Sequence, residues 1–221
     1  MKTTALYIAL PLAAFAALVS PRTVLSQDEA KPSAKDPADL MEAYMKLIAP
    51  GPEHKELKKL VGNWSTKQKL WMSPGAPPQE NVGTAKFRMA MGGRYLVQTY
   101  AAEIPGMGKF VGRGTTAYDK VSKEYVSTWI DSLGTGIMIS RGKVTDTGSM
   151  ELRGEAVDPF TKEKGVVRTV SSPIDAKYHK FEMFEKKGDA DERKIMEIVY
   201  TRTASPEKKG SDKKTKAKKV D

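Results

Sequence analysis

The sequence has no cysteine and only two histidines, His54 and His179. The absence of cysteine excludes disulfide bonds, thiol catalysis and cysteine-ligated metals, so the fold must rest on its hydrophobic core. No histidine and carboxylate occur together at metal-binding spacing, and we therefore expect no metal site made by the protein alone. The sequence also lacks a Gly-X-Ser-X-Gly elbow and a phosphate-binding loop, which removes two common signatures of enzymes.

Long apolar runs are missing as well, apart from one near the start. Residues Ala5 to Val19 form this run, which follows Lys2 and is interrupted by Pro11. The run is shorter than the roughly 20 residues that a membrane-spanning helix needs. With the small residues before Gln27, it predicts a signal peptide over residues 1–26, a retained amphipathic anchor being the alternative. We expect an exported protein, periplasmic or secreted, with no transmembrane segment in the mature chain.

Positive charge is concentrated at the C-terminal end. The formal net charge is +10, and removal of residues 1–26 takes away two cations and no acid, which leaves +8. Residues 204–221 hold seven lysines against three acidic residues, so half of that excess lies in a segment without an apolar pattern. We expect this tail to be disordered, with an anionic envelope polymer as its possible partner. The rest of the chain is only mildly basic, which argues against specific nucleic-acid binding.

Helical periodicity follows a predicted linker over residues 27–37. Asp36 and Pro37 have the properties of an N-cap and a first helical residue. Apolar residues then recur at helical spacing at Leu40, Met41, Tyr44, Leu47 and Ile48. A second short helix is expected from Pro52 to Val61, with His54 in solvent. The side chains expected to close one end of a barrel are Leu40, Tyr44, Leu47 and Leu57.

After Gly62 the period changes from helical to two. Ten strands are expected, at residues 63–72, 84–91, 94–103, 109–118, 124–131, 136–144, 149–157, 166–172, 177–187 and 193–203. Short turns and the absence of a helical insert predict an all-β fold, a closed antiparallel up-and-down barrel within a domain of residues 38–203, with a sandwich as the alternative. Gly92-Gly93 is expected to form a tight hairpin turn. Gly112 and Gly114 indicate a bent strand or a close approach to the backbone.

The first and last strands supply the predicted structural residues Gly62, Trp64 and Arg202. We expect Trp64 to plug one end of the barrel and the Arg202 guanidinium to stack on its indole. Such a contact is worth about 0.5–1 kcal/mol when exposed and about 2 kcal/mol or more when desolvated. The alternative is an ordinary core tryptophan and an unrelated arginine at the strand edge.

The candidate ligand-binding residues are Trp129, Asp131, Tyr125, His179, Arg94 and Tyr118. Trp129 and Asp131 share a strand face with Tyr125, which suits a ligand that has an apolar side and one polar group. The alternative is a turn in which Asp131 binds the backbone while Trp129 fills the core. An inward His179 could ligate haem or act as a general base, the alternative being an ordinary buried histidine. An inward Arg94 would need an anionic partner.

Several of these residues lie in motifs of fixed order. The motifs are Pro50-Gly51-Pro52-Glu53-His54, Leu60-Val61-Gly62-Asn63-Trp64, Gly92-Gly93-Arg94-Tyr95-Leu96, Tyr118-Asp119, Tyr125 to Ser132, and Tyr200-Thr201-Arg202. Together they resemble the bacterial domain-of-unknown-function family numbered 1579, over roughly Leu40 to Arg202. Because that family is uncharacterised, the resemblance implies a fold more than an activity. Gly62, Trp64 and Arg202 also resemble the lipocalin and wider calycin group, which implies a barrel that holds a small, mostly apolar ligand.

The leading hypothesis is an exported barrel that binds a small apolar or amphipathic molecule. One alternative is an enzyme of unknown class that uses Asp131 or His179 in the barrel cavity. The other is a structural or adhesive envelope protein with a filled barrel. A hollow interior with few polar groups would favour the first hypothesis, and a solid interior would favour the last.

Overall fold

The computed structural model describes residues 36–158 and 161–203. The predicted signal peptide, all of the predicted linker before residue 36 and the lysine-rich tail lie outside the described residues. The helices are α1 (Pro37–Ile48), α2 (Pro52–Lys58) and the short 3-10 helix η1 (Met91–Gly93). The strands are β1 (Gly62–Leu70), β2 (Gln79–Ala90), β3 (Tyr95–Ile104), β4 (Gly108–Asp119), β5 (Glu124–Asp131), β6 (Met138–Val144), β7 (Met150–Val157), β8 (Lys164–Ser171), β9 (Tyr178–Lys187) and β10 (Arg193–Arg202).

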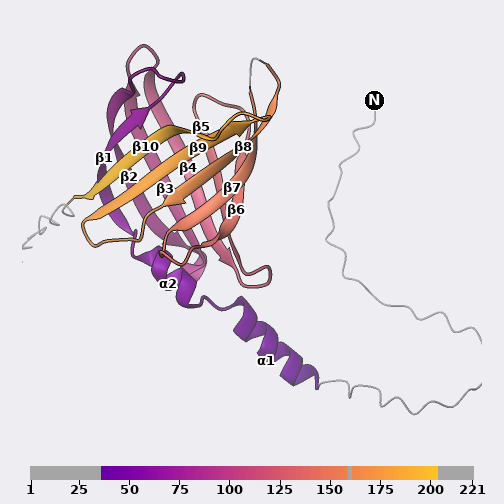
Figure 1. Ribbon diagram of the computed structural model, residues 1–221. Coiled ribbons are helices and arrows are strands. Elements are labelled where there is room, and N and C mark those ends of the chain that lie inside the picture. Colours follow the sequence, from indigo (N-terminus) through magenta and orange to yellow (C-terminus); the bar gives the residue numbers. More distant parts are fainter. Residues whose placement is uncertain (1–35, 159–160, 204–221) are drawn as a thin grey trace, which may run out of the picture.

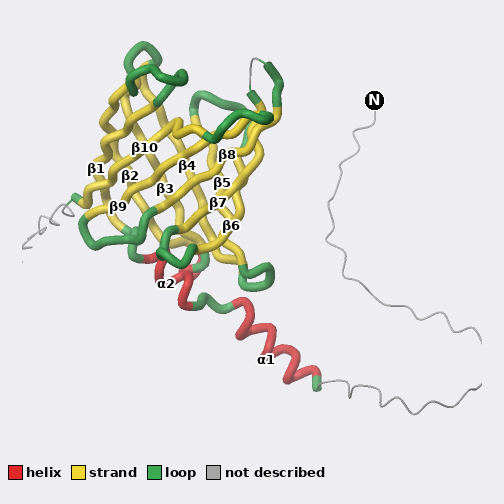
Figure 2. Tube along the Cα trace, viewed as in Figure 1, coloured by secondary structure: helices red, strands yellow, loops and turns green. Residues whose placement is uncertain are grey.

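These ten strands form one closed barrel in sequence order, every neighbouring pair being antiparallel. The predicted all-β up-and-down barrel is therefore confirmed. Closure through β1 and β10 pairs both edges of the sheet, which removes the free strand edges on which aggregation begins. Figures 1 and 2 show the tilted strands around one interior, with α2 against one end and α1 extending away from it.

We call the end where β1 begins, β10 ends and α2 packs the closed end, and the opposite end the open end. Side chains alternate between the interior and the outer surface, because successive residues of a strand point to opposite faces. In β1, for example, Trp64, Thr66 and Gln68 are buried, whereas the residues between them are exposed. This is the alternation that the sequence predicts for the first strand.

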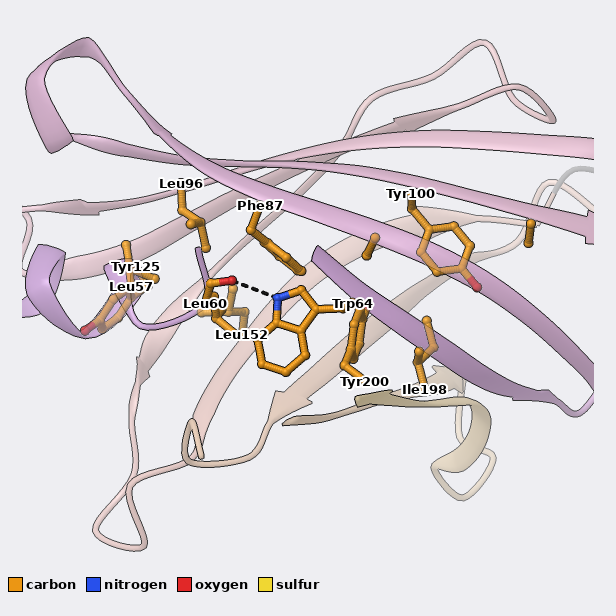
Figure 3. Packing of buried hydrophobic residues seen from close by; sticks show 12 residues of the cluster. Leu57, Leu60, Trp64, Phe87, Leu96, Tyr100, Tyr125, Leu152, Ile198 and Tyr200 are labelled. Carbon is orange, nitrogen blue, oxygen red and sulfur yellow. Dashed lines mark hydrogen bonds between the residues drawn. The ribbon is translucent and has the colours of Figure 1, made fainter. Parts of the chain in front are cut away.

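Trp64 lies at the centre of the closed-end core and is only 1% exposed. Its Nε1 donates a hydrogen bond of 2.9 Å to the carbonyl oxygen of Leu60, as Figure 3 shows. Its ring meets those of Phe87 and Tyr200 edge to face, both at centroid distances of 6.5 Å. Leu57 packs in the same cluster. Trp64 thus links the turn after α2 to the barrel wall, and it plugs this end as predicted.

The predicted contact between Trp64 and Arg202 is also confirmed. The two residues are cross-strand partners, and the guanidinium carbon lies 4.1 Å from the indole centroid. The guanidinium donates to the carbonyl oxygens of Lys59 and Val61, both at 2.6 Å, and to that of Ala176 at 2.7 Å. Arg202 therefore connects β10 to the segment between α2 and β1.

Gly62 leaves room for this arginine. Its φ of +141° is one that side-chain-bearing residues rarely adopt, and a Cβ there would lie 2.6 Å from Nη1 of Arg202. Any larger residue would therefore be strained and would also displace the guanidinium. The three predicted structural residues act together.

Only the second helix closes the barrel, so the prediction for the first is wrong. Leu57 is 3% exposed, but Leu40, Tyr44 and Leu47 are 52%, 57% and 40% exposed. The chain turns between Ile48 and Pro52, so that α1 extends past the barrel instead of covering it (Figure 1). The Lys120 ammonium, on the turn after β4, holds the last turn of α1 by donating to the carbonyl oxygens of residues 46 and 49 at 2.8 and 3.1 Å.

The turn between β2 and β3 also differs from its prediction. Instead of a tight turn at Gly92-Gly93, residues 91–93 form η1, in which all three have positive φ. Arg94 follows this turn and precedes β3, and it donates to the carbonyl oxygen of Met91 at 3.2 Å. Arg94 was expected inside a strand, where an inward side chain would need an anionic partner. Its nearest polar partner is instead a backbone carbonyl of the same turn.

Candidate functional site

Trp129 of β5 lies flat against the neighbouring strand β4. Gly114 is its cross-strand partner, and Gly112 is the partner of Asp131. A Cβ at Gly112 would lie 2.2 Å from Cζ2 of the indole, and one at Gly114 would lie 3.1 Å from Cε3. Only glycine lets the ring rest on this part of the wall. The close approach predicted from these two glycines is an approach by a tryptophan ring.

The indole is fixed in this position by its own hairpin. Its Nε1 donates to Oδ2 of Asp131 at 2.9 Å, and Oδ1 of Asp131 accepts from the backbone N–H of Leu133 at 2.9 Å. Asp131 therefore binds the backbone of its turn, as the alternative interpretation predicted, and it also orients the aromatic ring; the predicted role in ligand binding stays a prediction. Trp129 remains partly exposed. Since β4 covers one face of the ring, this exposure lies away from that wall.

A row of hydroxyl groups runs across three strands beside Trp129. Ser127 pairs with Ser140 on β6 and with Thr116 on β4, and the Ser127 and Thr116 hydroxyl oxygens are 3.2 Å apart. Ser140 is 2% exposed, and its Oγ has no hydrogen-bond partner among the described residues. A buried polar group without a partner costs about 1–3 kcal/mol. The Ser140 hydroxyl is therefore one of the few buried polar groups in the described residues whose hydrogen bonding is incomplete.

Asn81 of β2 provides a second such atom. It is 6% exposed, and its Nδ2 donates to Oε1 of Gln68 at 3.4 Å, while its Oδ1 has no partner within the described residues. The sequence-based prediction missed both Asn81 and Ser140. Their inward positions in the strand alternation were the available signal, since a polar residue at an inward position needs a partner.

Tyr118 and Tyr125 lie at the closed end, away from Trp129. Their ring centroids are 5.0 Å apart, and they face α2, whose His54 meets Tyr118 edge to face at 6.3 Å. Burial, assisted by the charge of Glu53, raises the pKa of Tyr125 to about 12. Tyr125 is therefore neutral at physiological pH, and both tyrosines belong to the packing beneath α2.

His54 was expected in solvent, and that expectation is wrong. The side chain is 6% exposed, and its Nδ1 accepts a hydrogen bond of 3.0 Å from the backbone N–H of Gly51. Burial lowers the pKa of His54, an effect that the charge of Glu53 opposes. His54 is the N3 residue of α2, so its imidazole supplies the half of a capping box in which the N3 side chain accepts from the backbone N–H of the N-cap residue.

His179 occupies a third place, at the start of β9. It is the cross-strand partner of Tyr200, and the two ring centroids are 5.5 Å apart. Burial lowers the pKa of His179 to about 4, so the ring is neutral at physiological pH. Its Nδ1 is buried and has no partner among the described residues. His179 is also one of the residues that line an open depression of about 330 Å³, with Ser172, Pro173 and Tyr178.

The charged side chains near the open end pair with one another. Lys187 and Asp158 are 2.7 Å apart, and Arg193 binds Glu185. Residues 158, 185 and 187 also line a concave space of about 120 Å³ at this rim. Because cations and carboxylates are matched, this part of the rim offers a ligand little net charge.

The predicted ligand-binding residues are therefore distributed over four places, one of which is the turn between β2 and β3 that holds Arg94. Trp129 and Asp131 form one unit toward the open end, Tyr118 and Tyr125 pack beneath α2, and His179 lies against Tyr200. Residues 36–158 and 161–203 contain no group of three or more His, Cys, Asp or Glu side chains that could hold a metal ion. No helix within these ranges is long and apolar enough to cross a membrane.

Residues 49–202 match the family described as "Protein of unknown function (DUF1579)", a range that includes α2 and all ten strands. The chain belongs to the DUF1579 family. The resemblance inferred from the ordered motifs is thereby confirmed. A comparison with curated proteins gives no match. The chain is also similar to a solved barrel, "Crystal Structure of Rv2717c from M. tuberculosis", at 18% identity and a TM-score of 0.48, over 71% of this chain and 100% of that chain.

Proposed function

We propose that this DUF1579 barrel binds a small, largely apolar molecule with one polar group, which enters at the open end. The observation that carries the proposal is the position of Trp129. Its indole is held on one wall by Gly112 and Asp131 and still keeps exposed surface. An aromatic ring fixed in advance loses little conformational entropy on binding, which is how binding sites use aromatic side chains.

The polar part of the ligand has two candidate partners. Ser140 Oγ and Asn81 Oδ1 are buried and lack hydrogen-bond partners among the described residues. Ser140 lies on β6, next to the strand that carries Trp129, and its neighbour in the hydroxyl row is Ser127. A ligand hydroxyl, amide or protonated carboxyl group would remove the cost of leaving such an oxygen unpaired.

The test is a titration with anilinonaphthalene sulfonate, a fluorescent probe with an apolar ring system and one polar group. We expect the wild-type chain to bind the probe and Trp129→Ala to weaken the affinity at least about tenfold, as truncation of a central aromatic contact does. Trp71→Ala is the matched control, because Trp71 lies outside this wall, where the Lys194 ammonium is 5.9 Å from its ring centroid. Equal affinities of the two variants would contradict the proposal.

Native mass spectrometry of the protein isolated from its own host tests the alternatives in the same material. A retained small molecule that is lost in Trp129→Ala supports the proposal. A haem absorbance band that His179→Ala abolishes would favour haem ligation instead. Absence of both a retained molecule and probe binding would favour a filled, structural barrel.

We also propose that the chain is exported, to the periplasm or beyond. The support is the apolar run from Ala5 to Val19 behind Lys2, with small residues before Gln27. N-terminal sequencing of the protein from its host should then begin at Gln27. A sequence that begins at Met1 would contradict cleavage at this site.

A further inference from the structure

The apolar side of α1 has no partner within the described part of the chain. Its side chains are 37–61% exposed at Leu40, Met41, Tyr44, Met45, Leu47 and Ile48. At about 100° per residue these six fall on one side of the helix, whereas Asp39, Glu42 and Lys46 fall on the other. A contiguous exposed apolar stripe marks an interaction site, because single exposed apolar residues are common but a stripe is not.

The same end of the barrel exposes further apolar side chains. Val121 is 74% exposed and follows Lys120, whose ammonium holds the end of α1. Met91, in the turn η1, is 75% exposed. Arg94, which follows that turn, donates to the carbonyl oxygen of Met91. The apolar surface is therefore a property of the closed end and extends beyond α1.

The lysine-rich segment leaves the barrel at this same end. Thr203 donates its backbone N–H to the carbonyl oxygen of Asn63 at 2.9 Å, and Arg202 binds the carbonyl oxygens at the end of α2. Residues 204–221 follow directly, with seven lysines and three acidic residues. An apolar helix and a cationic segment therefore start from one end of the molecule.

We propose that the closed end docks on the surface of an anionic lipid bilayer. The apolar side of α1 lies in the interface between headgroups and acyl chains, and the lysines after Thr203 contact the anionic headgroups. Stable attachment to a bilayer commonly needs two such signals, one apolar and one cationic. A soluble anionic polymer would leave the α1 stripe in water, and a second copy of this chain would leave the lysines without counter-charge. The open end then faces away from the bilayer.

The test is co-sedimentation with vesicles, using a chain that starts at Gln27 and keeps every described residue. We expect strong binding to vesicles that combine phosphatidylcholine with phosphatidylglycerol, and weak binding to phosphatidylcholine alone. Removal of residues 204–221 should reduce the partition coefficient at least about tenfold and remove its dependence on salt, since each lysine near the surface adds to the attraction. The thermal midpoint of this truncated chain should stay within a few degrees of the wild type.

Substitutions on α1 test the apolar signal. Leu40→Ser, Tyr44→Ser and Ile48→Ser, combined, should also lower the partition coefficient at least about tenfold without changing the fold, because all three side chains are exposed. The matched control combines Val82→Ser, Met107→Ser and Ile137→Ser, which lie toward the open end and are 72%, 58% and 66% exposed. This control should bind like the wild type.

Because the chain has no cysteine, a single introduced thiol can report which end meets the lipid. Tyr44→Cys and Met107→Cys are each labelled with an environment-sensitive dye. We expect a blue shift of the emission on addition of anionic vesicles for the label at residue 44 alone.

Four outcomes would overturn the proposal. These are no binding to anionic vesicles, equal binding by the α1 variant and its control, a blue shift at residue 107, and binding to a polyphosphate that depends on the lysines while vesicles are ignored. A dimer in light scattering that the α1 variant dissolves, without vesicle binding, would assign the stripe to a second copy instead. None of these results depends on a ligand inside the barrel, so the proposal stands or fails separately from the proposed function.

Discussion

Two tryptophans, one toward each end of the barrel, show how differently the same fold uses an indole. Trp64 is enclosed, with the Arg202 guanidinium over its ring, Phe87 and Tyr200 at its edges, and its Nε1 bound to a backbone carbonyl. Trp129 rests one face on β4, binds a carboxylate of its own hairpin and stays partly exposed. Trp64 holds the barrel closed, whereas the Trp129 ring is held in one position and keeps part of its surface exposed.

The neighbours of each tryptophan follow the same division. Around Trp64, the buried side chains Phe87, Leu96 and Tyr200 leave little apolar surface in contact with solvent. Toward the open end, Phe110 and Met196 join the core only in part. Inside the barrel, the aromatic cluster around Trp64 is therefore packed more completely than the residues near Trp129, although α1, Met91 and Val121 keep exposed apolar surface on the outside of the closed end. Stability and binding should accordingly respond to different substitutions.

Trp64→Ala should have the largest effect on stability. Truncation of a fully buried aromatic residue typically costs about 3–5 kcal/mol, because both its burial and its packing are lost. Chemical denaturation at neutral pH measures this free energy of unfolding. Trp129→Ala is the comparison, and it should cost less, since part of that ring is exposed. If the order of these two costs is reversed, the division between the ends is wrong.

Acid should destabilise the closed end through His179. The pKa of His179 is about 4 in the folded chain, whereas an unperturbed histidine, as in the unfolded chain, has a pKa of 6.5. The unfolded chain therefore binds the proton first as the pH falls. The stability contributed by neutral His179 is complete above pH 6.5 and declines as the pH falls toward 4, by about 3 kcal/mol in all. Unfolding of wild type and His179→Gln between neutral pH and pH 4 measures this. Parallel curves for the two proteins would contradict the burial of this ring.

Arg202→Ala should cost about 2 kcal/mol, because the stack on Trp64 is lost and three backbone carbonyls lose a charged donor. Arg202→Lys should restore little of this, since an ammonium cannot reach carbonyls on two separate segments while it covers the indole. The Trp64→Ala and Arg202→Ala double mutant should cost less than the sum of the single mutants. Additive costs in denaturation would show that the two ends of the barrel sequence do not act together.

Gly112→Ala should have the smallest effect on stability, about 1 kcal/mol, because the added Cβ pushes aside an indole that is already partly exposed. It should nevertheless weaken binding of anilinonaphthalene sulfonate, since the Trp129 surface changes its position. Gly136→Ala is the control, because no heavy atom lies within 4 Å of the Cβ position there. Unchanged probe binding in the Gly112→Ala variant would show that Trp129 is not part of the surface that binds the probe.

The strands could be predicted from the sequence because the inward and outward sides of a barrel impose a period of two. The pairing of Trp64 with Arg202 could be predicted for a related reason, since closure must bring the first and last strands together. Gly112 and Gly114 predicted that another group approaches the backbone of β4 closely, although only the structure shows that this group is the Trp129 ring. These features depend on local pattern and on the order of the strands.

The candidate site was harder to predict because residues that share a strand face can lie at different levels of the barrel: four positions along one strand span about 13 Å. Trp129 and Tyr125 share a strand face, but Tyr125 packs beneath α2 while Trp129 lies toward the open end. The helical spacing of apolar residues in α1 predicted an apolar side, but it did not indicate which surface that side contacts. The charged neighbours of His54 predicted that its side chain lies in solvent. Nothing in the local sequence indicated that the imidazole accepts a hydrogen bond from the backbone N–H of Gly51.

Hydrogen exchange of the backbone amides, with and without anilinonaphthalene sulfonate, tests the division between the two ends most directly. Amides in well-packed regions open rarely, so exchange should be slowest near Trp64 and Tyr200, where β1 and β10 pair. The probe should then slow exchange mainly in the hairpin of β4 and β5 around Gly112 and Trp129. Uniform exchange along the barrel, or protection by the probe at the closed end, would contradict this account.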